Sequence, residues 1–122
     1  MRKYLLHVLI ISFVFFLTPT VPVASYAGEI ETYKQEVEKN PDDVEAHCNL
    51  GLAYYKSGMY KEAIESFKQT IRINPDDAGA HFNLGDAYLG LNDEDSALEQ
   101  YEILKSLDSE LANKLFNLIY SE

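Results

Sequence analysis

The chain has 122 residues, of which 10 are basic and 20 acidic, giving a formal net charge of −10 at pH 7. A chain of this length holds one domain at most. Its acidity repels phosphate backbones and anionic lipid headgroups, so nucleic acid is excluded as an expected partner. Cys48 is the only cysteine, so no internal disulfide can form. We expect it to be a small buried apolar residue, with a cross-link between two chains as the alternative.

Residues 1–27 have the three regions of a secretory signal peptide. A basic start at residues 2–3 precedes an apolar run over 5–17, and small residues stand before an expected cut at Gly28 (Ser25 and Ala27). We therefore predict a protein that is exported to the periplasm or secreted.

An uncleaved membrane anchor is the alternative for this segment. A span needs about 20 apolar residues, whereas Pro19 and Pro22 interrupt the run early. With cleavage, the loss of Arg2 and Lys3 leaves 8 basic against 20 acidic residues, a net charge of −12. Any contact with a membrane is expected only through this N-terminal segment.

A phrase near the middle of the chain occurs twice, as "NPDDVEAHCNLGLAY" and as "NPDDAGAHFNLGDAY", thirty-four residues apart. Residues 40–73 and 74–107 align without a gap and are identical at thirteen of thirty-four positions. This period and pattern resemble the tetratricopeptide repeat family. The residues that carry the resemblance are His47, Leu50, Gly51, Tyr54, Ala63, Phe67, Thr70 and Pro75, then His81, Leu84, Gly85, Tyr88, Ala97, Tyr101 and Leu104. The sequence departs from the family pattern with His at the fourth position of both repeats and with Ser109 in place of the last proline.

The resemblance implies an all-α solenoid of antiparallel helix pairs. In the first repeat, the acidic Asn-Pro-Asp-Asp opening and the break at Gly58 predict helices over 43–56 and 60–73. The second repeat, 74–107, should copy this arrangement. Residues 28–39 form a leading helix from a partial repeat, and 108–122 form a closing helix. We expect the closing helix to pack through one face, made of Leu111, Leu115, Leu118 and Ile119.

Gly51 and Gly85 stand inside predicted helices, where glycine costs about 1 kcal/mol relative to alanine. Such a cost is explained if the two helices of each pair approach closely there. The repeat thus describes how helix pairs stack on copies of themselves.

The sequence shows no catalytic arrangement and no phosphate-binding loop, so we expect no enzyme activity, no cofactor and no small-molecule substrate. His47, Cys48 and His81 suggest a metal site, but zinc ligands must converge within about 2.3 Å of one ion. Equivalent residues of stacked helices lie about 10 Å apart, so we expect packing histidines and no metal. The acidic residues of 92–99 are expected to lie at a turn and the first turn of a helix, not in a calcium loop.

The resemblance implies that the first helix of each repeat lines the inner face of the solenoid. The residues at these positions form what we call the inner-face track: Glu45, Cys48, Leu52, Tyr55, Phe82, Asp86 and Leu89. Its apolar members would form a strip of the kind that usually marks a binding site. Coverage of that strip by the chain's own neighbouring helix is the alternative.

Family members that grip the C-terminal carboxylate of heat-shock chaperones use a set of cationic and amide side chains. Of these only Asn83 is matched here, while Cys48 and Leu52 replace a lysine and an asparagine. We therefore predict a non-enzymatic interaction module of the cell envelope that binds a peptide or protein, but not through this clamp. A structural subunit that self-associates as a homodimer is the alternative, and sedimentation of the mature protein separates the two.

Overall fold

The computed structural model describes residues 24–121 of the chain, and within this range it contains six α-helices and no strand. The expected all-α fold is thereby confirmed. The expected signal peptide lies outside the described residues, apart from its last four. The helices are α2 (Ala24–Lys39), α3 (Val44–Lys56), α4 (Tyr60–Ile73), α5 (Ala78–Gly90), α6 (Glu94–Leu107) and α7 (Ser109–Ile119).

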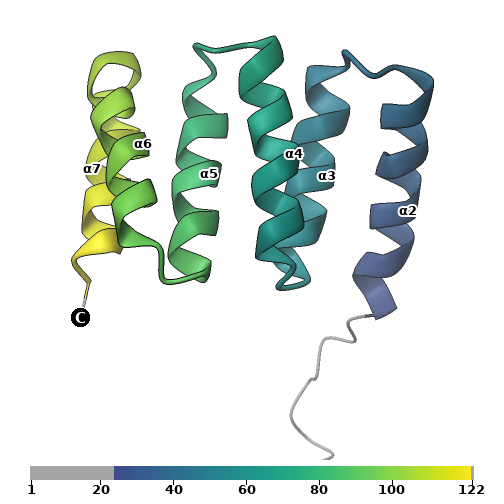
Figure 1. The fold of residues 1–122 in the computed structure, drawn as a ribbon, viewed down its shortest axis with the longest axis horizontal. Helices are drawn as coiled ribbons and strands as arrows, with labels where there is room; N and C mark the ends of the chain where they lie inside the picture. Colours follow the sequence, from purple (N-terminus) through teal and green to yellow (C-terminus); the bar gives the residue numbers. More distant parts are fainter. Residues whose placement is uncertain (1–23, 122) are drawn as a thin grey trace, which may run out of the picture.

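The helices stand in one row of antiparallel neighbours, with α2 at one end and α6 and α7 at the other (Figure 1). Each helix contacts the next along the chain, and in addition α5 contacts α3 and α7. Among the described helices, α2 contacts only α3. The resulting stack of hairpins is the predicted solenoid.

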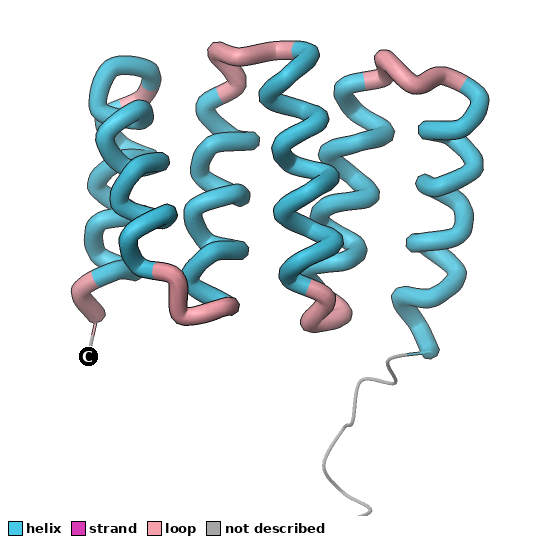
Figure 2. The backbone as a smooth tube through the Cα atoms, viewed as in Figure 1, coloured by secondary structure: helices cyan, strands magenta, loops and turns pink. Residues whose placement is uncertain are grey.

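Short loops join the helices (Figure 2). An aspartate caps the start of α3, α5, α6 and α7. Asp43 and Asp77 are equivalent N-caps whose carboxylates accept hydrogen bonds from the amides of Ala46 at 3.1 Å and Ala80 at 2.9 Å. Asp93, Glu94 and Asp95 lie at the turn and in the first turn of α6, as predicted. Asp93 is also the N-cap, since it accepts hydrogen bonds from the Ser96 amide and hydroxyl. Because these caps are local in sequence, the starts of the helices could be predicted closely.

The two turns within repeats end on left-handed residues. Gly58 has φ of 77° and Asn92 has φ of 58° at the equivalent position of the second repeat. Glycine and asparagine are the residues that adopt this conformation most readily. The turn therefore has the same geometry in both repeats although its sequence differs.

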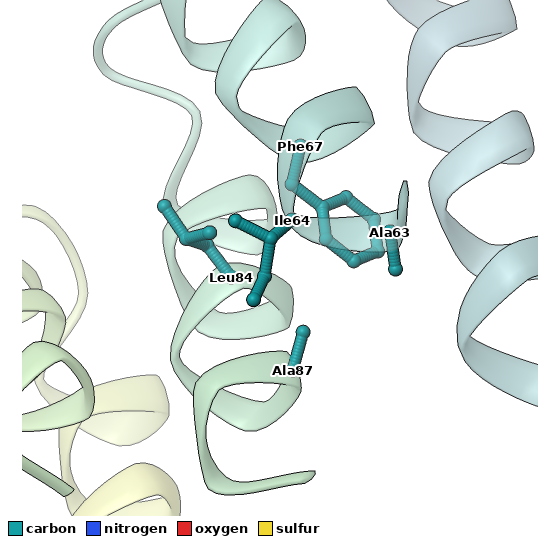
Figure 3. Packing of buried hydrophobic residues seen from close by; sticks show 5 residues of the cluster. All are labelled: Ala63, Ile64, Phe67, Leu84 and Ala87. Carbon is teal, nitrogen blue, oxygen red and sulfur yellow. The ribbon is translucent and has the colours of Figure 1, made fainter. Parts of the chain in front are cut away.

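Two buried clusters form the core. The first joins α4 to α5 and consists of Ala63, Ile64, Phe67, Leu84 and Ala87 (Figure 3). The second joins α6 to α7 and consists of Ala97, Leu104, Ala112, Leu115 and Ile119. In each cluster two alanines bring the helices together and three larger side chains fill the space between them.

Gly51 and Gly85, which stand at equivalent positions of the two repeats, have different neighbours. A Cβ atom at Gly51 would lie 2.6 Å from the Phe67 ring in the partner helix α4, as expected for close packing within a pair. At Gly85 the nearest atom, also at 2.6 Å, belongs to Leu115 of α7. The second glycine therefore makes room for the closing helix as well as for its partner helix α6, where Cβ of Gln100 would lie 3.4 Å away.

The closing helix packs through a face slightly rotated from the predicted one. Leu115 and Ile119 are buried and Leu111 is half-buried, but Leu118 is 43% exposed, so its placement on the packing face was wrong. Ala112 takes its place in the core with 2% exposure. A small residue allows a closer approach to α6 than leucine would, which turns Leu118 outward.

The leading helix begins at Ala24, four residues before the expected cleavage point at Gly28. None of the described helices is both long enough and apolar enough to cross a bilayer. The membrane-anchor alternative concerns residues outside the described range.

Candidate functional site

The structure places the inner-face track on the first helices of both repeats, α3 and α5. Glu45 is exposed, and the other six members are half-buried. Leu52 and Tyr55 pack against the first core cluster, whereas Phe82 and Leu89 pack against the second. The chain's own core thus covers part of each apolar side chain and leaves the remainder accessible.

Tyr55 and Asp86 connect the two halves of the track. The Tyr55 hydroxyl on α3 donates a hydrogen bond of 2.9 Å to Oδ2 of Asp86 on α5. The Tyr55 ring also contacts the Tyr60 ring edge-on, with 5.4 Å between centroids. Burial, and then the hydrogen bond to the Asp86 carboxylate, raise the pKa of Tyr55 to about 12. The neutral phenol is the form that the folded protein favours.

We expect Tyr55 to ionise only in strongly alkaline solution. Its ionisation should lower the free energy of unfolding. The pKa of the phenol rises from 10.0 to about 12 on folding, so its contribution is complete below pH 10 and is lost as the pH approaches 12. Phenolate absorbance of the wild type minus that of Tyr55→Phe should show one late-titrating tyrosine. The control is Tyr120→Phe, because Tyr120 is 58% exposed. Equal difference spectra for the two variants would contradict the role of Asp86.

The track is shallow. A hollow on it has a volume of about 50 Å³ and is lined by Leu52, Tyr55, Phe67, Asn83 and Asp86. This is far below the roughly 300–1,000 Å³ that is typical of ligand sites, so the hollow does not admit a large side chain. A ligand of the track would therefore lie across α3 and α5 and would not enter between them.

Cys48 is half-buried, so the expectation of a buried residue was wrong, and its thiol is free. Burial raises the pKa of its thiol, and the nearby carboxylates of Asp77 and Glu45 raise it further. Because the thiolate is the reactive form, these surroundings lower the reactivity of Cys48.

The two histidines have the packing role that the sequence predicted. They are buried, and each bonds through Nε2 to the carbonyl oxygen of the proline six residues earlier, Pro41 or Pro75, at 2.8 Å. This bond ties the start of each helix pair to the loop before it. No group of three potential metal ligands occurs within residues 24–121.

A larger hollow lies outside the track, and the sequence analysis did not identify it. It has a volume of about 520 Å³ and lies between α2 and α4, with α3 as its floor. It shares no residue with the track. The repeat alignment shows a difference at this place, because Ser66 of α4 stands at the position that Gln100 occupies in α6.

Sequence comparison decides the family. The TPR repeat model matches residues 26–58 and 53–92, and the tetratricopeptide repeat model matches residues 78–110. The chain belongs to the tetratricopeptide repeat family. Tetratricopeptide repeat domains are protein–protein interaction modules and are generally not enzymes. No curated protein matches the chain.

Solved tetratricopeptide repeat structures share the fold. MamA is 27% identical with a TM-score of 0.71; the match covers 80% of this chain and 58% of MamA, so the chain spans less than two thirds of that protein. The second TPR domain of human RPAP3, solved with the HSP70 peptide SGPTIEEVD, has 22% identity, a TM-score of 0.74 and coverage of 81% and 84%. PcrH, solved with the chaperone binding region of PopD, has 14% identity, a TM-score of 0.71 and coverage of 98% and 90%.

Proposed function

We propose that this protein is an exported, non-enzymatic adaptor of the cell envelope that holds a peptide segment of a partner across its inner-face track. The observation that carries the proposal is a half-buried apolar strip spanning two consecutive repeats, joined by the hydrogen bond between Tyr55 and Asp86. Apolar surface of this kind contributes about 25 cal/mol per Å² when a partner covers it. The peptide-bound states of RPAP3 and PcrH support the same use of the fold.

The shallow form of the track indicates what kind of ligand it fits. An extended or helical segment that spreads several apolar side chains over Leu52, Tyr55, Phe82 and Leu89 would cover the strip. Glu45 and Asp86 place carboxylates at its margin, so a segment with flanking basic residues is favoured over an acidic one. Export is supported by the pattern of residues 1–27.

The test is the triple substitution of Tyr55, Phe82 and Leu89 by alanine. We expect it to abolish co-purification of the partner that is cross-linked to the wild-type protein in its own cell envelope, with helix content unchanged by circular dichroism. The matched control replaces three apolar side chains outside the track, Met59, Leu91 and Ile103, which are 39%, 40% and 39% exposed. Retention of the partner by the track variant would remove the track from consideration.

The track side chains also contact the core, so a second variant guards against unfolding. Leu52→Lys combined with Leu89→Lys keeps aliphatic stems against the core and places charge on the strip. The same loss of partner with intact helix content is expected.

Self-association remains the second candidate. It is supported by the apolar end of the solenoid, where Phe116, Leu118 and Tyr120 are 41%, 43% and 58% exposed. A tight dimer in sedimentation at micromolar protein would favour it.

A further inference from the structure

The hollow between α2 and α4 has the size and composition of a binding groove. Its volume of about 520 Å³ lies within the range of about 300–1,000 Å³ that is typical of ligand sites. Val37 of α2 and Leu50 and Tyr54 of α3 supply apolar surface. Among the described helices α2 contacts only α3. The backbones of α2 and α4 therefore do not pack against each other, and the groove lies between them.

Two buried polar side chains that line this groove, His47 and Ser66, each have an atom without a hydrogen-bond partner among residues 24–121. His47 is 7% exposed and bonds through Nε2 to Pro41, but within residues 24–121 its Nδ1 has no hydrogen bond, and neither does the hydroxyl of Ser66, which is 6% exposed. Every fully enclosed side-chain nitrogen and oxygen in this range has a partner. The free atoms of His47 and Ser66 are therefore accessible from the groove.

The second repeat shows which group satisfies this histidine. At the equivalent place, Nδ1 of His81 lies 2.8 Å from the carboxamide of Gln100, which is 8% exposed and stands where the first repeat has Ser66. A carboxamide can bond to Nδ1 whether or not that nitrogen carries a proton. Its NH2 group donates to a bare Nδ1, and its oxygen accepts from Nδ1–H. Gln100 thus supplies a partner for His81 from within the chain, whereas the shorter Ser66 makes no hydrogen bond to His47.

Charges at the rim favour a neutral ligand. Lys34 and Lys61 stand among Glu38, Glu62 and Glu65, so both signs are present and neither dominates. A strongly anionic or cationic group would meet like charges there, whereas an uncharged amide would not.

We propose that the groove binds a peptide segment of a partner protein that inserts a glutamine or asparagine side chain against His47, in the manner of Gln100, and lays apolar neighbours on Val37, Leu50 and Tyr54. This site is separate from the inner-face track and would serve a second contact with a partner. Its ligand is recognised by a carboxamide between apolar side chains.

The probe is the blocked peptide acetyl-Leu-Gln-Leu-amide, titrated into the full-length protein and followed by NMR. We expect chemical-shift changes at Val37, Leu50 and Ser66, and binding about five- to tenfold tighter than that of acetyl-Leu-Met-Leu-amide, which has a similar length but no amide to meet His47. The acidic peptide acetyl-Leu-Glu-Leu-amide should also bind more weakly. Equal affinity for the three peptides, or no binding of any of them, would overturn the proposal.

Substitutions at Ser66 provide matched variants. Ser66→Gln should reproduce the contact of Gln100 and weaken binding of the glutamine peptide at least tenfold, whereas Ser66→Ala keeps the groove open and should change it less than about twofold. If Ser66→Gln does not fold, Val37→Phe fills the groove from α2 and takes its place. Unchanged binding in the filled variant contradicts the proposed site.

The inner-face variant Leu52→Lys/Leu89→Lys separates this site from the track. We expect it to bind the glutamine peptide as the wild type does. Loss of binding in that variant, or shifts confined to the track, would assign the peptide to the inner face and reject the groove.

Discussion

Replacing Phe67 by alanine is expected to lower the free energy of unfolding by about 3–5 kcal/mol. The side chain is 0% exposed and is the largest member of the cluster that joins α4 to α5. Its ring also lies against Gly51 of α3, so the same side chain helps to hold three successive helices. In a solenoid each helix is covered only by its neighbours, and no other part of the core can compensate for the loss.

Gly51→Ala provides a second test of the same contact. It should destabilise the wild type but stabilise the Phe67→Ala variant. In the wild type, Gly51→Ala places a Cβ atom 2.6 Å from the Phe67 ring, and such overpacking costs about 1–3 kcal/mol. In the Phe67→Ala background that ring is absent, and alanine should stabilise the helix by up to about 1 kcal/mol. The two residues are therefore expected to be strongly coupled.

Chemical denaturation of the four proteins in this cycle measures both effects. Phe116→Ala is the control for loss of an aromatic side chain, since Phe116 is 41% exposed and should cost far less. Gly28→Ala is the control for the glycine, because a Cβ atom there meets nothing within 4 Å. If Gly51→Ala had the same effect in both backgrounds, close approach at Gly51 would not be the reason for the glycine.

The helices could be predicted from the sequence because local chemistry determines their ends. Asp43 and Asp77 cap helix starts, and Gly58 ends the turn between α3 and α4. Helix α4 has the predicted bounds, Tyr60–Ile73, and its apolar stripe forms the buried face. Each of these features depends on residues that are close together in the chain, so the sequence pattern alone was sufficient to predict the helix ends.

Features that depend on how helices rotate against one another could not be predicted in the same way. Leu118 was assigned to the packing face, but a modest rotation of α7 exposes it and buries Ala112. The hydrogen bond between Tyr55 and Asp86 joins positions in different repeats, and no periodicity requires it. Neither could the contact of Gly85 with Leu115 be foreseen without the position of the closing helix.

Departures from the repeat were more informative about sites than the repeat itself. The shared residues define the helix pairs, and they are the same in any copy of the unit. Ser66 and Gln100 differ at equivalent positions: Gln100 contacts Nδ1 of His81, whereas Ser66 lines an open groove and leaves Nδ1 of His47 without a partner among the described residues. A comparison of buried positions between the repeats would have identified this place before the structure.

Leu115→Ala is expected to cost about 2–5 kcal/mol and to act first at the C-terminal end. Leu115 is 0% exposed, lies against Gly85 and belongs to the cluster that holds α7 to α6. Helix α7 contacts only α5 and α6 among the described helices, so loss of this side chain should release it locally before the rest unfolds.

Hydrogen exchange and denaturation together test this order of events. Amides of α7 in Leu115→Ala should exchange much faster than in the wild type, and those of α3 should change less. Leu118→Ala is the matched control, because Leu118 is 43% exposed on the same helix and its loss leaves no cavity. Equal costs for the two leucines would show that α7 does not pack as described. Faster exchange spread evenly over α3 and α7 would instead mean that the solenoid unfolds as one unit and that the closing helix is an inseparable part of it.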